Sequence, residues 1–202
     1  TRAGNAIWIE TASEGVPRSA RITSSPNCAI DNAETPSLSA DGSILAFVRE
    51  DHGRGSLWVV DTRRCNDPAT VHPVRITPPE FDVRSMSPGA NNTFLISSVY
   101  GGLERVFAVK PGESPRLLAE AGAPLDSPSL SPDGKAIALR ELIAERWQLM
   151  LLNLSSRTWK QLTYGDCNAY TPSWQDNRTL LYATDCMRGI GFSTLASLQV
   201  DR

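Results

Sequence analysis

Residues 127–134 read Ser-Pro-Ser-Leu-Ser-Pro-Asp-Gly, and residues 35–42 are an almost identical copy, Thr-Pro-Ser-Leu-Ser-Ala-Asp-Gly. A shorter form, Thr-Pro-Ser-Trp-Gln-Asp-Asn, occupies residues 171–177, and a degraded form, Val-Arg-Ser-Met-Ser-Pro-Gly, occupies residues 83–89. The third residue of each copy is a serine that marks the register of the repeat, and these register serines, Ser37, Ser85, Ser129 and Ser173, are 48, 44 and 44 residues apart. Such constant spacing indicates a structural repeat.

Each copy is followed by the same pattern of short strands and polar turns. The Pro-Ser-Leu-Ser segment predicts a strand, and Asp-Gly or Asp-Asn predicts the tight turn after it, because these residues tolerate positive φ. Second strands are expected at residues 44–48, 93–97, 136–140 and 179–183, and third strands at residues 57–61, 105–109, 148–152 and 194–200. Fourth strands are expected at residues 74–77, 115–118 and 160–163. Four antiparallel strands in about 44 residues predict an all-β fold, a β-propeller of four-stranded blades.

The two ends of the sequence are incomplete copies of this repeat. Residues 7–10 and 20–23 resemble the third and fourth strands of a blade, and the last copy stops after its third strand. We therefore expect a single propeller domain over residues 1–202, with seventeen strands. Its blades are predicted at residues 1–33 (partial), 34–80, 81–122, 123–165 and 166–202. Two interpretations stay open: residues 20–23 complete the last blade and close the ring, or the chain is part of a longer, open propeller.

The repeat resembles one known family. Pro-Ser-Leu-Ser-Pro-Asp-Gly-Lys at residues 128–135, followed by Ile-Ala-Leu, is similar to the repeat of the TolB-type (PD-repeat, WD40-like) β-propeller family. Leu-Trp-Val-Val-Asp at residues 57–61 and the endings Arg-Ile-Thr (75–77) and Gln-Leu-Thr (161–163) match that family's later strands. The resemblance implies the fold, but not one function. Such blades occur in periplasmic TolB, in the propellers of prolyl-oligopeptidase-type peptidases and in sensory domains of bacterial regulators.

Composition excludes two classes of partner. The 202 residues include 20 Lys and Arg against 22 Asp and Glu, a net charge of −2. A dedicated nucleic-acid binder needs a basic surface, so we expect no nucleic acid as a partner. The longest apolar runs fall far short of the ~20 residues needed to span a bilayer, so no membrane span is expected.

Residues for catalysis are scarce. The sequence has no Gly-x-Ser-x-Gly motif, and its two histidines, His52 and His72, lie in polar loops beside Gly or Pro. No His/Cys group has the spacing of a zinc site, and the Asp-Gly turns are too short for a calcium loop. We therefore predict a non-enzymatic protein with no catalytic residue, metal or cofactor.

Aligning the repeats brings four polar residues into one candidate site. Three residues before each register serine are Glu34, Asp82, Asp126 and Tyr170. First strands line the central channel of a propeller, so equivalent positions would form a ring at one mouth of the channel. Such a ring would attract a cation or a basic peptide. Replacing Asp82 and Asp126 by Asn should then lower the affinity for a basic ligand and hardly change folding, because exposed charges contribute little to stability. The alternative is that the four residues are ordinary solvated residues of the loops before the strands.

Four cysteines permit up to two disulfides. Cys167 precedes the first strand of the last blade and Cys186 follows its second strand, so both are expected on one face and are predicted to pair. Cys28 and Cys65 lie in loops that normally emerge on opposite faces, so their pairing is the less secure prediction. A disulfide requires an oxidising compartment, which favours a periplasmic or extracellular protein and leaves the cytoplasm open.

These observations favour a binding module. The leading hypothesis is a non-catalytic propeller scaffold in a bacterial envelope or extracellular setting. Its partner would be a protein or a peptide, and a basic partner would suit the acidic positions. One alternative is the substrate-gating propeller of a prolyl-oligopeptidase-type serine peptidase, and another is a sensor of a small ligand or carbohydrate. Unpaired strand edges at the ends would also allow a homo-oligomer.

Overall fold

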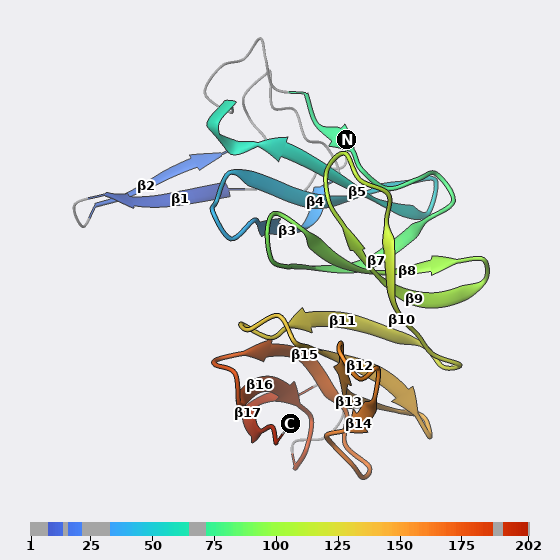
Figure 1. Cartoon of the computed structure of the whole chain (residues 1–202). Helices are drawn as coiled ribbons and strands as arrows, with labels where there is room; N and C mark the ends of the chain where they lie inside the picture. The colour runs from blue at the N-terminus through green and yellow to red at the C-terminus, as the bar shows by residue number, and fades with distance from the viewer. Residues whose placement is uncertain (1–7, 14–15, 22–32, 65–71, 188–191, 202) are drawn as a thin grey trace.

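The chain forms antiparallel sheets that stand side by side around a common centre (Figure 1). The computed structural model describes residues 8–13, 16–21, 33–64, 72–187 and 192–201. Within these residues there are seventeen strands and one short 3₁₀ helix, η2 (Thr62–Arg64). An all-β propeller with four blades is confirmed, and the described part contains no α-helix.

Three blades have four strands each, the fourth blade has three, and a separate hairpin precedes them. The hairpin consists of β1 (Trp8–Ser13) and β2 (Val16–Arg21). Blade 1 contains β3 (Ala33–Leu38), β4 (Ile44–Asp51), β5 (Arg54–Asp61) and β6 (Val74–Arg75). Blade 2 contains β7 (Asp82–Pro88), β8 (Phe94–Tyr100), β9 (Leu103–Val109) and β10 (Arg116–Glu120). Blade 3 contains β11 (Leu125–Leu130), β12 (Ala136–Ile143), β13 (Arg146–Asn153) and β14 (Trp159–Gln161). Blade 4 contains β15 (Ala169–Trp174), β16 (Thr179–Thr184) and β17 (Thr194–Gln199).

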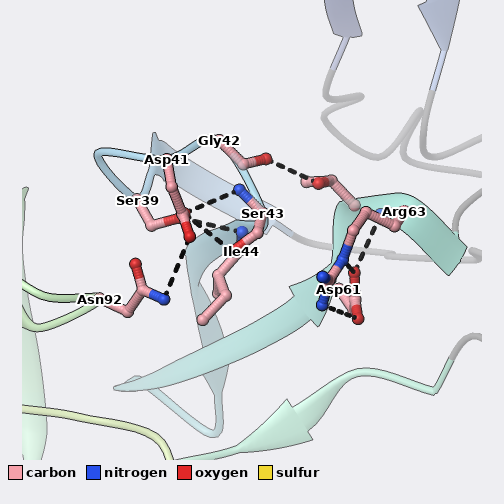
Figure 2. Close-up of polar contacts among 9 residues, drawn as sticks. Ser39, Asp41, Gly42, Ser43, Ile44, Asp61, Arg63 and Asn92 are labelled. Carbon is pink, nitrogen blue, oxygen red and sulfur yellow. Dashed lines mark hydrogen bonds and ion pairs between the residues drawn. The ribbon is translucent and has the colours of Figure 1, made fainter.

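The Ser-x-Asp-Gly segment builds the turn between the first and second strands. In blade 1 the Asp41 carboxylate accepts hydrogen bonds from the Ser39 hydroxyl and from the Ser43 backbone and hydroxyl, at 2.6–3.0 Å (Figure 2). Gly42 follows at φ 69°, a conformation that favours glycine. These bonds, the Ser39 hydroxyl first, lower the pKa of Asp41. Blade 3 repeats the turn around Asp133 and Gly134.

Neighbouring blades pack through aliphatic cores. Blades 1 and 2 enclose one core that includes Leu57, Phe81 and Val83, and similar cores join blade 2 to blade 3 and blade 3 to blade 4. The blades approach closely at Gly55, where a Cβ atom would lie 2.0 Å from the Val83 carbonyl oxygen. The glycine therefore lets β5 sit directly against the next blade.

No hydrogen-bonded pairing between described strands closes the ring. Ala20 and Arg21, predicted as candidates for completing the last blade, pair instead with Ile9 and Trp8 of β1. The sheet of blade 4 ends at β17. Of the two interpretations of the ends, the described residues match the open arrangement. They contain no helix with the length and hydrophobicity needed to cross a bilayer.

The predicted Cys167–Cys186 disulfide is confirmed, with Cα atoms 5.1 Å apart. Cys28 and Cys65 lie outside the described residues. Next to the bridge, the Asn168 backbone and side chain donate to the two oxygens of Asp185, at 2.6 and 2.7 Å. The side-chain oxygen of Asn168 accepts the backbone N–H of Trp147 at 2.9 Å, so the Asn168 side chain also links blade 4 to blade 3.

We predict that Gly55→Ala destabilises the protein by about 2–3 kcal/mol, because the added methyl group overpacks the contact between blades 1 and 2. Thermal unfolding should shift down by roughly 4–12 °C. The matched control is Gly122→Ala, since a Cβ at Gly122 meets no atom within 4 Å. Equal melting temperatures for the two variants would contradict this account of blade packing.

The Asp185 pair predicts a pH dependence of stability. Hydrogen bonds from the Asn168 side chain, and then from its backbone, lower the pKa of Asp185 below its ordinary 3.8. The stabilisation is therefore present above pH 3.8 and is lost as the pH falls through the lowered pKa. Asp185→Asn should be less stable than wild type at pH 7, with a gap that narrows in acid. Urea unfolding at several pH values measures this, with exposed Asp166→Asn as the control. A gap independent of pH would refute it.

Candidate functional site

The first strands of the four blades enclose a central cavity of about 490 Å³. Strand β3 contacts β7, β7 contacts β11, and β11 contacts β15, so these are the innermost strands (Figure 1). None of the side chains that line the cavity is charged. Seven carry a hydroxyl group: Thr35, Ser85, Ser87, Ser127, Ser129, Thr171 and Ser173. Prolines, Met86, Leu130 and Trp174 supply the apolar part of the wall.

A β-bulge in each first strand shapes this wall. The ladders to the second strands shift by one residue between Glu34 and Ser37 and at the equivalent places in the other three blades. In three blades the extra residue precedes proline and has positive φ: Thr35 at 46°, Ser127 at 50° and Thr171 at 45°. Positive φ is costly for β-branched threonine and is retained where the surrounding structure enforces it. The bulge thereby places one hydroxyl side chain from each of these blades on the cavity wall.

Some of the cavity's polar groups are already paired. The Ser85 hydroxyl accepts the Ser127 N–H at 2.9 Å and lies 2.6 Å from the Ser97 hydroxyl. The Trp174 indole N–H donates to the Ser129 carbonyl oxygen at 3.0 Å. The Ser87 hydroxyl oxygen is buried and has no hydrogen-bond partner among the described residues. The cavity therefore offers hydroxyl groups and apolar surface, which suit an uncharged group.

The four residues predicted to form a ring lie within the first strands and not in the loops before them, so the loop placement assumed in the alternative is wrong. Glu34, Asp126 and Tyr170 each precede a cavity-lining bulge residue, and Asp82 is the first residue of β7. They sit inside because the strands begin two to three residues earlier than the Pro-Ser pattern suggests. Glu34 is exposed.

Asp82 and Asp126 are paired with arginine. The Asp82 carboxylate lies 2.6 Å from the Arg84 guanidinium nitrogen Nη2. It also accepts a hydrogen bond, at 2.9 Å, from the backbone N–H of Gly55 in blade 1. Asp126 forms a two-pronged pair with Arg140 on the neighbouring strand β12. The Asp82 and Asp126 side chains are only 15% and 20% exposed. These positions therefore present ion pairs, and their attraction for a cation is weaker than that of open carboxylates.

Arg140 also joins blade 3 to blade 4. Its guanidinium carbon lies 4.3 Å from the centre of the Trp147 ring and 5.4 Å from that of Tyr170. Both contacts are within the range of cation–π attraction. Tyr170 is thus tied to Arg140, and its ring belongs to a contact between blades.

The other candidates form no site in the described residues. No group of three or more His, Cys, Asp or Glu side chains there could hold a metal ion. His52 and His72 are exposed, and the His52 ring lies 2.7 Å from Asp51, its sequence neighbour. The hydroxyl-lined wall was not predicted, although the Thr-Pro-Ser and Ser-Pro-Ser segments that build it are the most regular feature of the sequence.

Comparison of the whole fold with solved structures finds clear matches. TolB from Acinetobacter baumannii superimposes with a TM-score of 0.74 at 21% identity, over 96% of this chain and 46% of that one. The fold is that of a TolB-type β-propeller. A protein assigned as TolB from Agrobacterium tumefaciens gives a TM-score of 0.70 at 17% identity, over 92% of this chain and 66% of that one. A puromycin-hydrolysing peptidase from Mycobacterium tuberculosis gives 0.62 at 18% identity, over 83% of this chain and 27% of that one.

These matches confirm the predicted TolB-type fold. At such identities they establish the architecture and not the activity. The chain spans about half the length of one of these TolB structures and two thirds of the other. No protein-family model and no curated sequence matches the chain.

The Asp126–Arg140 pair should be worth more to stability than an exposed pair. Asp126→Asn leaves a largely buried guanidinium without its carboxylate, so we predict a loss of about 1–3 kcal/mol. This replaces the expectation that such a change would hardly affect folding. Glu113→Gln breaks the exposed Lys110–Glu113 pair and should cost less than about 0.5 kcal/mol. Urea unfolding measures both changes, and equal costs would contradict the difference.

Proposed function

We propose that this TolB-type propeller is a non-catalytic domain that binds a segment of a protein or peptide at its central cavity. One observation carries the proposal: four blades contribute equivalent strands to one cavity whose lining residues are hydroxyl-rich and uncharged. Hydroxyl groups hydrogen-bond to peptide amides, and the prolines, Met86 and Trp174 provide apolar contact.

The residues at the mouth would tune the choice of peptide. Glu34, Asp82, Asp126 and Tyr170 remain our candidates for the ligand's entry point. Because Asp82 and Asp126 are paired with arginines, their attraction for a basic ligand would be weakened, and Glu34 would add the charge of an exposed carboxylate. That preference should be modest and should weaken with salt, since an exposed carboxylate is screened.

The Cys167–Cys186 disulfide supports a periplasmic or extracellular location, because such bonds persist in oxidising compartments. TolB-type propellers as structural neighbours are in keeping with a bacterial envelope setting.

The second candidate function is a substrate-gating propeller of a serine peptidase. The match to the mycobacterial puromycin-hydrolysing peptidase favours this function. The match covers 27% of the peptidase chain, so most of that chain lies outside the matched region. A reading frame that continues into an α/β-hydrolase segment would select this function. An upstream signal peptide without a hydrolase would select the binding scaffold.

Fluorescence anisotropy with three labelled octapeptides tests the proposal. Alanine peptides that carry alternating Lys, Ser or Glu isolate the effect of charge. We expect saturable binding in the order Lys, Ser, Glu, with the Lys preference about two- to fivefold at low salt and smaller at high salt. Glu34→Gln should reduce the Lys preference and leave the Ser peptide unaffected.

The cavity itself is tested by Ser173→Phe, which fills it from an exposed position on β15. This variant should weaken all three peptides. Ser155→Phe, at an exposed turn outside the cavity, is the matched control and should bind as wild type. Unchanged binding by Ser173→Phe would reject the cavity as the site.

A further inference from the structure

A second cavity lies between blades 2 and 3. Its volume is about 440 Å³, within the range of small-molecule sites, about 300–1,000 Å³. Blade 2 supplies most of its wall, through the turn before β8, the loop between β9 and β10, and β10 itself. Blade 3 supplies Leu130, Gly134 and Leu154. Each of these two blades has four strands and packs against a described blade on either side, so the cavity is built by complete sheets.

The floor of this cavity is aliphatic. Leu95, Ala108 and Leu118 line it and are buried in the core that joins the two blades. Leu130 and Leu154 of blade 3 are partly buried and pack against the same core. An apolar chain that enters the cavity therefore contacts aliphatic side chains and removes the exposed parts of the last two leucines from water.

The charged side chains around the cavity do not balance. Lys110 and Glu113 line it and form an ion pair at 2.7 Å, so their charges largely cancel. Arg116 on β10 also lines it, is exposed, and forms no ion pair or side-chain hydrogen bond with any described residue. In addition, the Arg157 guanidinium of blade 3 donates to the carbonyl oxygen of Leu118 at 3.1 Å. The excess of positive charge favours an anion.

Uncharged hydrogen-bond donors line the same cavity. The side chains of Asn91, Thr93 and Ser114 face it and make no hydrogen bond within the part of the chain that the structure describes. Amide and hydroxyl groups donate to carboxylate oxygens, and a guanidinium can bind a carboxylate through two parallel N–H groups. A carboxylate therefore finds a cation and several neutral donors here. An ammonium group finds Glu113, which Lys110 already occupies.

We propose that the cavity between blades 2 and 3 is a binding site for a small aliphatic carboxylate, such as a medium-chain fatty acid. The apolar chain lies on the leucine floor, and the carboxylate pairs with Arg116. The site goes beyond the function proposed for the central cavity and does not depend on it. Leu130 is the one described residue that lines both cavities.

Octanoate is the probe, and amide shifts in NMR spectra of the intact ¹⁵N-labelled protein measure both affinity and location. We expect saturable shifts centred on residues 89–95 and 108–118. Octanol lacks the charge and should bind about three- to tenfold more weakly, and octylamine more weakly still. Butanoate should bind at least about tenfold more weakly than octanoate, because each buried CH₂ group adds to the affinity.

Arg116→Gln tests the contribution of the charge. It should reduce the affinity for octanoate about three- to tenfold and leave the affinity for octanol unchanged. Folding should not change, because Arg116 is exposed and has no described partner. The matched control is Arg54→Gln, at an exposed arginine of blade 1 outside the cavity, which should bind octanoate as wild type does.

Ser114→Phe tests the cavity itself, because it places a large side chain there from an exposed position. This variant should lose both octanoate and octanol, whereas Ser114→Ala should bind octanoate within about twofold of wild type. Ser173→Phe, which fills the central cavity, should also retain octanoate. The failure of this site and the failure of the function proposed for the central cavity are therefore distinguishable.

Three results would overturn the proposal. The first is the absence of saturable shifts up to about 10 mM octanoate. The second is equal affinity for octanoate, octanol and octylamine, or equal weakening by Arg116→Gln and Arg54→Gln. The third is tighter binding of acetyl-Ala-Ala-Leu, with a free carboxyl terminus, than of octanoate. In that case the carboxylate would belong to the end of a polypeptide and not to a free aliphatic acid.

Discussion

The structure depends on the packing of each blade against the first strand of the next. Leu57, Phe81 and Val83 belong to one core, and Gly55 lets the backbones approach where no side chain would fit. The same arrangement joins the other described blades, with smaller residues such as Ala169 against Leu149. Because each blade needs a neighbour to bury its aliphatic face, the blades are not independent units.

The first strands both pack the blades together and line the cavity, and the β-bulge lies between the residues that do each. On one side of the bulge, Ala33, Leu125 and Ala169 are buried in the contacts between strands and blades. At the bulge, Thr35, Ser127 and Thr171 line the cavity with strained positive φ values. An unbulged strand would keep strict alternation and could not place the hydroxyl and the following proline in this way. The cavity is therefore a product of backbone irregularity, which makes its shape depend little on long, flexible side chains.

Much of the fold was predictable because its determinants are local. The Ser-x-Asp-Gly turn is held by bonds within five residues, so the repeat specified the turns, the second strands and their order. The disulfide was predictable because its cysteines flank one predicted pair of strands.

The starts of the first strands were not predictable from the sequence. Glu34 and Asp126 are held in strands by pairing with β4 and β12, and no local motif encodes this pairing. Cross-strand pairing also hid the Asp126–Arg140 ion pair, because the two residues are fourteen positions apart. The acidic positions were visible in the aligned repeats, but the arginines that pair with Asp82 and Asp126 were not.

The cavity would recognise a partner mainly through a wall that the fold builds in advance. It is formed by the innermost strands and offers side-chain hydroxyls, so a ligand there is selected by shape and by hydrogen bonds to a largely preformed wall.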